Sequence, residues 1–217
     1  MQLTPDGAQL FSAAFAPDQI SALENALASV PVDRPGTRLK PIPGLAALVQ
    51  PARSIAASIL GGTARAVRAV LFDKSPARNW ALGWHQDRTI AVRSRVDMPG
   101  FSDWTVKDGI PHVVPPFEIL ARMLTLRVHL DPVGSDNAPL LIVPGSHRLG
   151  RIAEPEIADI AARLGEASCL AERGDLWLYA TLILHASARA AEPNRRRVLQ
   201  LLYSADDLPG RLEWLGV

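Results

Sequence analysis

The segment 120–130 limits the possible folds of this chain more than any other stretch. Its second half alternates apolar with polar side chains: Leu124, Thr125, Leu126, Arg127, Val128, His129 and Leu130. Successive side chains on a β-strand point to opposite faces, so one face of this strand is apolar and the other carries groups that can bind a ligand. Such a strand suits the polar interior of a β-barrel better than a dry core. We therefore expect a sheet-rich fold that surrounds a site.

The order of the predicted elements indicates an α+β fold with a core made of strands. Helical patterns come first, at 17–30, 44–50 and 52–60, and Ala-rich faces would let these helices pack closely on a sheet. Short apolar segments typical of buried strands follow, at 66–73, 120–130, 139–143, 176–184 and 196–203. One further helix is expected at 154–167, and the tail after residue 204 is expected to lie over the surface. Helices followed by many strands favour an α+β arrangement.

Length and composition indicate one globular domain inside the cell. The 217 residues suffice for one domain, with a helical part at about 1–62 and a strand core at about 64–204. The formal net charge of +1 argues against nucleic acid or a membrane surface as the main partner. Cys169 is the single cysteine, which excludes an intramolecular disulfide and fits a reducing cytoplasm. No apolar run approaches the roughly 20 residues needed to span a bilayer, and the first residues lack the pattern of a signal peptide.

A stretch rich in proline and glycine, 97–118, is expected to form a long loop. It contains Phe101, Trp104, His112 and Phe117. A loop of this length in a compact domain is usually functional or disordered, and the aromatic residues argue against disorder. We interpret it as a lid or substrate-facing loop, or as a surface excursion packed by its own side chains.

The stretch Gly83–Asp87 carries an imidazole and a carboxylate two residues apart, in His85 and Asp87. On an extended strand, residues i and i+2 project from the same face, so both groups can point at one position. They could supply two ligands of the two-histidine, one-carboxylate iron site, which leaves coordination positions free for substrate and oxygen. The alternative is that both side chains satisfy hydrogen bonds within a loop.

His185 is the predicted third ligand because it ends the strand predicted at 176–184. Ser187 and Arg196 follow it at spacings that suit a co-substrate. A dicarboxylate co-substrate needs a cation for its far carboxylate, and the planar arginine fork can bind both oxygens of that group.

Taken together, these motifs resemble the phytanoyl-CoA dioxygenase family of iron(II)- and 2-oxoglutarate-dependent oxygenases. The matching stretches, in the order of that family, are Trp84–Asp87, Asp136–His147, Gly174–Asp175, His185–Ser187 and Arg196–Leu199. They span about residues 70–204. One motif alone would be weak evidence, but the ordered set is specific.

The resemblance implies a fold, a set of cofactors and a role for each matching residue. The fold would be a double-stranded β-helix, a jelly-roll core with the N-terminal helices packed on one sheet. His85, Asp87 and His185 would bind Fe(II), and 2-oxoglutarate and O2 would be the co-substrates. Ser187 and Arg196 would bind the far carboxylate of 2-oxoglutarate. Arg197 is the fallback for Arg196, because three arginines stand in a row at 195–197.

Two details of the motifs bear on the reaction and on the backbone. Asp87 is present where related halogenases have a small residue, so the resemblance implies hydroxylation of a small molecule, with release of succinate and CO2, over halogenation. An acyl-CoA thioester is not indicated. Ala138 stands where the family has glycine in an Asn-Gly turn, and we expect a different turn type because alanine resists positive φ.

Further candidates for the site come from the polar strand face and from residues near the motifs. Thr125 and Arg127 could contact 2-oxoglutarate, or they could satisfy each other's hydrogen bonds across the sheet. The candidates for substrate contact are Asn79, Trp84, Arg88, His112 and His129. The alternatives are core packing for Trp84, a surface position for His112 and a role for Arg88 in holding Asp87.

Two other classes of function fit parts of the pattern. A cupin-like metal-dependent hydrolase or isomerase would use the same three ligands without 2-oxoglutarate. A non-catalytic binding module could also share the scaffold. Ser187 and Arg196 favour the oxygenase, because neither alternative needs a site for a second carboxylate.

Overall fold

Three antiparallel sheets form the protein in a computed structural model that describes residues 3–32 and 34–217. In the large sheet the strand order is β1 (Ala8–Phe11), β11 (Leu176–Ala180), β8 (Leu124–His129), β13 (Arg196–Ser204), β3 (Arg65–Lys74) and β2 (Thr37–Arg38). The second sheet has the order β10 (Ala167–Cys169), β9 (Leu140–Ile142), β12 (His185–Ser187) and β4 (Leu82–His85). The third has β5 (Ile90–Ala91), β7 (Ile110–Val114) and β6 (Ser102–Lys107). The predicted jelly-roll core is confirmed.

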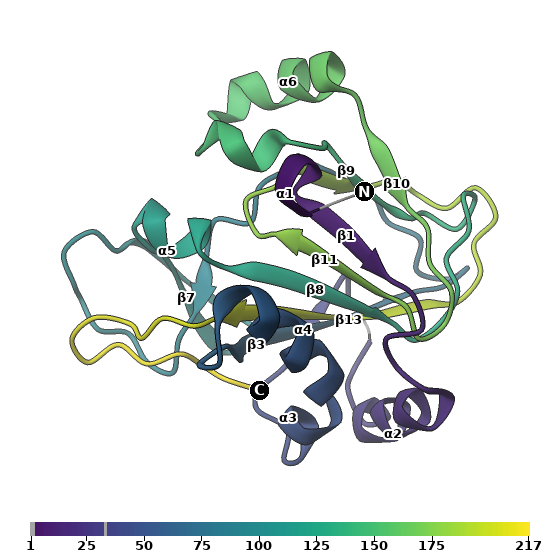
Figure 1. Cartoon of the computed structure of the whole chain (residues 1–217), viewed down its shortest axis with the longest axis horizontal. Coiled ribbons are helices and arrows are strands. Elements are labelled where there is room, and N and C mark those ends of the chain that lie inside the picture. The colour runs from purple at the N-terminus through teal and green to yellow at the C-terminus, as the bar shows by residue number, and fades with distance from the viewer. Residues whose placement is uncertain (1–2, 33) are drawn as a thin grey trace.

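Helices cover the outer face of the large sheet, as expected. The helices are α1 (Leu3–Asp6), α2 (Pro17–Leu27), α3 (Leu45–Leu48), α4 (Gln50–Leu60), α5 (Phe117–Ala121) and α6 (Ile157–Leu164). Helices α2, α3 and α4 lie below the large sheet in Figure 1, and α6 lies beyond the second sheet at the top. The largest core cluster joins Leu23 of α2 and Ala56 of α4 to Leu126 and Leu199 of the sheet. The apolar face of the 120–130 segment therefore packs on the helices.

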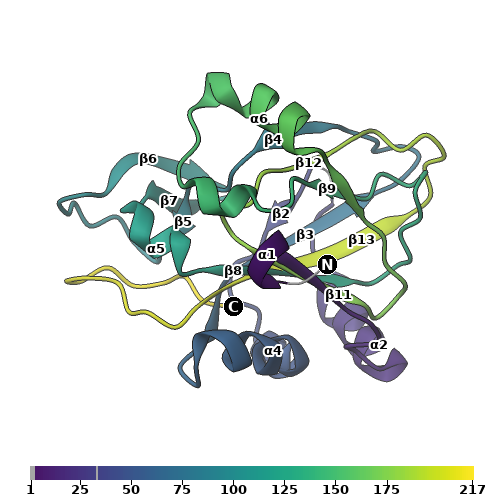
Figure 2. The same cartoon turned by 45° about the horizontal axis from the view of Figure 1, so that its top comes forward.

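The polar face of that segment looks the other way, between the two main sheets. Figure 2 shows the second sheet lying over the large one. A separate apolar cluster joins the two sheets and includes Ile142 of β9 and Trp177 and Tyr179 of β11. The remaining space is lined by polar residues of β3, β8 and β13, and it holds the site described below.

Two predicted strands are divided differently in the structure. The 120–130 segment begins with the end of α5 and becomes a strand only at Leu124. The 176–184 segment ends as a strand at Ala180, where a turn closed by the Ile183 N–H and the Ala180 carbonyl redirects the chain. His185 therefore does not end this strand. It lies in β12 of the second sheet.

The prediction of a long loop at 97–118 is wrong, because most of this segment is a β-hairpin. Strands β6 and β7 pair in antiparallel fashion, and α5 follows them. The turn between the strands uses positive φ at Asp108 and Gly109, a conformation that glycine adopts without strain. His112 is fully buried in this hairpin, so the expected surface position is also wrong.

The segment after residue 204 also differs from expectation. Leu208, Leu212 and Trp214 are buried and belong to a core cluster with Val92 and Phe101. Trp214 additionally bridges to Val92 as an isolated antiparallel pair. The tail is thus part of the core that supports the third sheet, where we had expected a surface covering.

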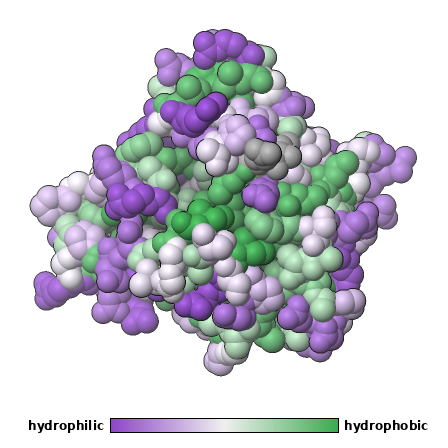
Figure 3. Space-filling model, viewed as in Figure 1, coloured by the Kyte–Doolittle hydropathy of each residue, from purple (hydrophilic) through white to green (hydrophobic). Residues whose placement is uncertain are grey.

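One face of the molecule has an apolar centre. Hydrophobic residues gather near the centre of the face in Figure 3, in the area that β1, β11 and β8 occupy in Figure 1, and hydrophilic residues surround them. Among the described residues, no helix combines the length and the apolar character that a membrane span requires.

Candidate metal centre

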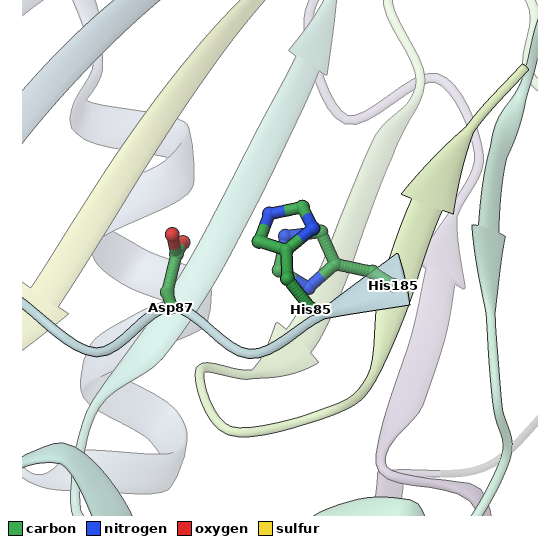
Figure 4. A group of neighbouring side chains, drawn as sticks. All are labelled: His85, Asp87 and His185. Atoms are coloured by element: carbon green, nitrogen blue, oxygen red, sulfur yellow. The ribbon is translucent and has the colours of Figure 1, made fainter. Parts of the chain in front are cut away.

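Two histidines face each other across neighbouring strands of the second sheet. His185 on β12 is the direct cross-strand partner of His85 on β4, and their ring centroids are 4.2 Å apart. Asp87 follows β4, and its carboxylate lies on the same side (Figure 4). One ligand atom from each of the three residues lies within 4.8 Å of the others. The structure therefore brings the three predicted ligands together.

Backbone carbonyls hold both imidazoles in the same way. The Nδ1 atom of His85 lies 2.7 Å from the Gly83 carbonyl oxygen, and Nδ1 of His185 lies 3.0 Å from that of Ile183. When Nδ1 donates these bonds, Nε2 keeps its lone pair for a metal ion, which is how outer partners usually fix metal-binding histidines. Burial, together with the charge of His85, lowers the pKa of His185 to about 4. The ring is therefore neutral at pH 7, the form that binds a metal ion.

Gln86 positions the aspartate, although Asp87 lies outside the strand that we had expected to carry both groups. Strand β4 ends at His85. The Gln86 amide donates to the carbonyls of Gly150 and Leu182, at 2.9 and 2.7 Å, and accepts a bond from the Ile152 N–H at 3.0 Å. These three bonds fix the backbone between the two ligands. The sequence analysis did not identify Gln86. The only sign of its role in the sequence is its position between the two ligands.

The Asp87 carboxylate is suited to a cation. Its Oδ2 atom is buried and has no hydrogen-bond partner among the described residues, an arrangement that costs free energy unless something binds there. Burial acts to raise the pKa of Asp87, but the charges of His185, Arg68 and His85 outweigh it and hold the pKa below its usual value. Two imidazoles aimed by backbone carbonyls, a carboxylate and free space fit a divalent transition metal such as Fe(II).

The three ligands line a cavity of about 530 Å³ between the two main sheets. Its wall is shared by residues of β2, β3, β4, β8, β12 and β13. A cavity of this size is within the range that holds small-molecule ligands. Strand β12 brings Ser187 into this wall together with His185.

One end of the cavity is cationic. Arg196 lines it with 2% of its surface exposed, and it donates a hydrogen bond to the Ala138 carbonyl, while its Nε has no partner among the described residues. Lys74 is the cross-strand partner of Arg196, and its Nζ lies 2.9 Å from the Ser187 hydroxyl and 2.7 Å from the Ala188 carbonyl. Arg196, Ser187 and Lys74 thus meet at one place. Sequence reasoning missed Lys74, which ends a predicted strand with no visible motif.

Arg197 faces away from this end. It forms ion pairs of 2.6 Å with both Asp131 and Glu24 on the outer side of the large sheet. Alternation along β13 explains the difference, because adjacent strand residues point to opposite faces. Of the two arginines, Arg196 is therefore the one placed to bind a molecule inside the cavity.

Ala138 adopts the backbone conformation that we had expected it to avoid. Its φ is 50°, in the left-handed region that glycine favours, so the expected change of turn type is wrong. This conformation costs an alanine about 1–2 kcal/mol. The turn is held at its two ends, since the Ala138 carbonyl accepts the bond from Arg196 and the Asn137 side chain accepts one from the Asn194 N–H.

The polar face of β8 contributes one residue to the cavity. Arg127 lines it and donates a 2.7 Å hydrogen bond to the Gln200 side chain. Thr125 is fully buried outside the cavity wall, with its hydroxyl 3.0 Å from that of Thr181, so its position does not support the expected contact with a co-substrate. His129 is also buried outside the wall, and burial with the charges of Arg127 and Arg196 lowers its pKa to about 3.

Of the other predicted substrate residues, only Arg88 reaches the cavity wall. It also bonds the Ile152 carbonyl at 2.6 Å. Asn79 instead exchanges two hydrogen bonds with the backbone of Ala190. Trp84 packs against an apolar cluster that includes Ile157 and Ala161 of α6. His112 lies inside the β6–β7 hairpin, so neither position supports substrate contact.

Comparison with known proteins agrees with the fold and the motifs. The structure superposes on EctD from S. alaskensis in complex with 2-oxoglutarate and 5-hydroxyectoine with a TM-score of 0.70, at 23% identity, covering 99% of this chain and 77% of that one. For the alpha ketoglutarate dependent carbocyclase SnoK of nogalamycin biosynthesis the TM-score is 0.68, at 16% identity, covering 93% and 80%. A search of curated proteins gave no match. The family model described as phytanoyl-CoA dioxygenase matches residues 6–198. The chain therefore belongs to the phytanoyl-CoA dioxygenase family.

Proposed function

We propose that this protein is a non-haem Fe(II)- and 2-oxoglutarate-dependent dioxygenase that hydroxylates a small molecule, releasing succinate and CO2. One observation carries the proposal. His85, Asp87 and His185 converge on one point in the same cavity whose end is formed by Arg196. A metal-ligand set and a buried cation in one cavity are the two requirements of a 2-oxoglutarate oxygenase.

The ligand set would hold the iron through Nε2 of each histidine and a carboxylate oxygen of Asp87. When bound, the iron supplies the oxidative chemistry with O2 and 2-oxoglutarate that no protein side chain can perform. The chain's contribution is to aim both imidazoles, through the carbonyls of Gly83 and Ile183, and to place Asp87 through Gln86.

The cationic end is suited to the far carboxylate of 2-oxoglutarate. The Arg196 fork can bind both carboxylate oxygens, and the Lys74 ammonium and Ser187 hydroxyl lie beside it. Burial of Arg196 keeps water from competing for these bonds, which strengthens them. Arg127 of β8 also lines the cavity, on the same face of the large sheet as Arg196, and it adds a further positive charge.

Hydroxylation is proposed because Asp87 supplies the carboxylate ligand, which is replaced in the halogenases that this family resembles. The structural neighbours span several reactions, since they include a carbocyclase and an epimerase as well as a protein in complex with 5-hydroxyectoine. We also propose a cytoplasmic location and a single catalytic domain. The free, buried Cys169 is consistent with a reducing compartment.

The proposal can be tested by adding Fe(II) and 2-oxoglutarate anaerobically, measuring the binding of each by calorimetry, then admitting O2 and measuring succinate. We expect stoichiometric binding of both and slow succinate release that a true substrate accelerates. A cupin-like hydrolase or isomerase would bind the metal without 2-oxoglutarate and form no succinate. A non-catalytic module would bind neither under these conditions.

The affinity for 2-oxoglutarate should fall as the pH rises above 7, because Lys74 then loses its proton. Burial, aided by the charges of Arg196 and Arg127, lowers the pKa of Lys74 from 10.5 to about 7. The protonated form attracts the dianion, so each pH unit above this pKa should weaken binding by up to about tenfold. Titrations of the Fe(II)-loaded protein from about pH 7 to about pH 8.5 measure this slope. The variant Lys74→Met should bind more weakly at pH 7 and lose the slope, and an unchanged slope in that variant would refute the assignment.

A further inference from the structure

The cavity has a second cationic region, remote from Arg196. Arg68 of β3, Arg38 of β2 and Lys107 of the β6–β7 hairpin all line it. Arg38 is the cross-strand partner of Val70, two residues from Arg68 on the same face of the sheet. Each of the three cations acts electrostatically on at least one of the others. They therefore form one group, which we call the distal cations.

Arg68 is the central member because it is buried without a partner. Only 7% of its surface is exposed, and its guanidinium forms no hydrogen bond or ion pair with any residue that the structure describes. Its Nε atom is completely buried and unsatisfied. Burial lowers the pKa of Arg68, and the charge of Asp87 only partly offsets this. A buried charge that lacks a partner is strongly unfavourable, which indicates that an anion completes the site.

The neighbouring residues do not supply this anion. Asp108 is already shared, since it forms ion pairs with Arg34 and Arg38 at 2.8 and 3.3 Å. Lys107 makes no ion pair with any described residue, so it adds a further positive charge to the group. Asp87 is the acidic residue of the cavity wall, and its carboxylate is assigned to the metal ion.

The co-substrate cannot satisfy both cationic regions at once. Lys74 and Arg68 lie on the same strand, six residues apart, so their backbones are separated by about 20 Å at the rise of a β-strand. The five-carbon chain of 2-oxoglutarate is much shorter than this. In the proposed binding mode its far carboxylate lies on Arg196 and its other end at the metal ion, so neither end is assigned to Arg68.

We propose that the distal cations bind the anionic group of the substrate, a carboxylate or a phosphate, and thereby present the rest of the molecule to the metal centre. This inference rests on the proposed function, and it names the class of substrate as a small organic anion. Between the two cationic regions the wall is apolar, with Val70, Phe72 and Trp80. Such a wall suits the uncharged body of the substrate.

The proposal can be tested with simple probes in the full chain. Phenylacetate and its neutral analogue phenylacetamide have nearly the same shape, and inorganic phosphate represents the other anion class. We would titrate each into the protein in low-salt buffer, with Fe(II) and saturating 2-oxoglutarate under anaerobic conditions, and follow the binding by calorimetry. We expect saturable binding of at least one anion in the millimolar range or tighter, and at least tenfold weaker binding of the amide. The better of the two anions identifies the head group.

Variants separate the distal cations from the 2-oxoglutarate site. Arg68→Met retains most of the side-chain length and should weaken anion binding by roughly 10- to 100-fold, while the affinity for 2-oxoglutarate stays within about twofold. Arg93→Met makes the same chemical change at an exposed arginine paired with Glu213, outside the cavity, and should leave anion binding unchanged.

Three outcomes would overturn the inference: equal binding of acid and amide, no saturable anion binding by the natural chain, or a loss of 2-oxoglutarate affinity in Arg68→Met. The last outcome would assign Arg68 to the co-substrate. Failure of the proposed function is seen separately, as missing Fe(II) binding or missing succinate. The variant His185→Ala distinguishes the two kinds of failure, since it should no longer bind the metal ion but should still bind the anion.

Discussion

Replacing His185 with alanine should reduce succinate formation to the background rate. His185 is buried, neutral and aligned by the Ile183 carbonyl, and it lies directly opposite His85. Changes to residues one step removed from a metal ion commonly cost 10- to 100-fold in affinity or activity, so loss of a ligand should exceed about 100-fold. The measurements are Fe(II) binding by calorimetry and succinate release under O2.

His147→Ala is the matched control for this experiment. His147 lies in the short helix at Ser146–Leu149 and outside the cavity wall, so its loss should leave Fe(II) binding unchanged. Comparing the circular dichroism and melting temperature of the metal-free proteins shows whether His185→Ala still folds. Normal Fe(II) binding and succinate release by a folded His185→Ala protein would disprove the ligand assignment.

Replacing Arg196 with alanine should raise the Kd for 2-oxoglutarate by about 100-fold and leave Fe(II) binding intact. The estimate follows from losing two charge-assisted hydrogen bonds at a buried site, each contributing about 1.5–3 kcal/mol, with partial compensation from Lys74. Arg196→Lys keeps the charge without the planar fork and should give an intermediate affinity. Calorimetric titration of the Fe(II)-loaded, anaerobic protein with 2-oxoglutarate measures the Kd of the natural chain and of both variants.

Arg197→Ala provides the contrast, because it changes the neighbouring residue on the opposite face. Its ion pairs with Asp131 and Glu24 should be lost, which lowers the free energy of unfolding by about 1–3 kcal/mol. Its affinity for 2-oxoglutarate should stay within about twofold of the natural chain. If Arg197→Ala weakened 2-oxoglutarate binding and Arg196→Ala did not, the roles of the two arginines would be reversed.

Sequence reasoning succeeded where chemistry is encoded in a local pattern. The alternation around Arg127 predicted a strand with one apolar face and one face toward a site, and the structure has this arrangement. His85 and His185 were predicted as partners, and they are paired across two strands. The ordered motifs indicate the family from the sequence alone, and the family match confirms it.

The failures concern residues whose role depends on contacts between distant segments. The hairpin at 102–114 was interpreted as a loop because its proline and glycine content masks the period-two pattern of β6. Gln86, Lys74 and Arg68 carry no motif. Lys74 is found only through its cross-strand pairing with Arg196, and Arg68 only through its place in the cavity wall. Ala138 was misjudged because its left-handed backbone is supported by the distant Arg196.

The position of β4 has a consequence for the lifetime of the protein. This strand lies at the edge of its four-stranded sheet, paired only with β12 through a register that is irregular beyond His185. A metal ion shared by His85 and His185 would fasten this edge to its neighbour, joining segments far apart in the chain. A ligand that binds only the folded state stabilises it by about 2.7 kcal/mol at a hundred times its Kd. The supply of the metal ion would then influence how long each molecule survives proteolysis, because the ion-free form would open this edge more often.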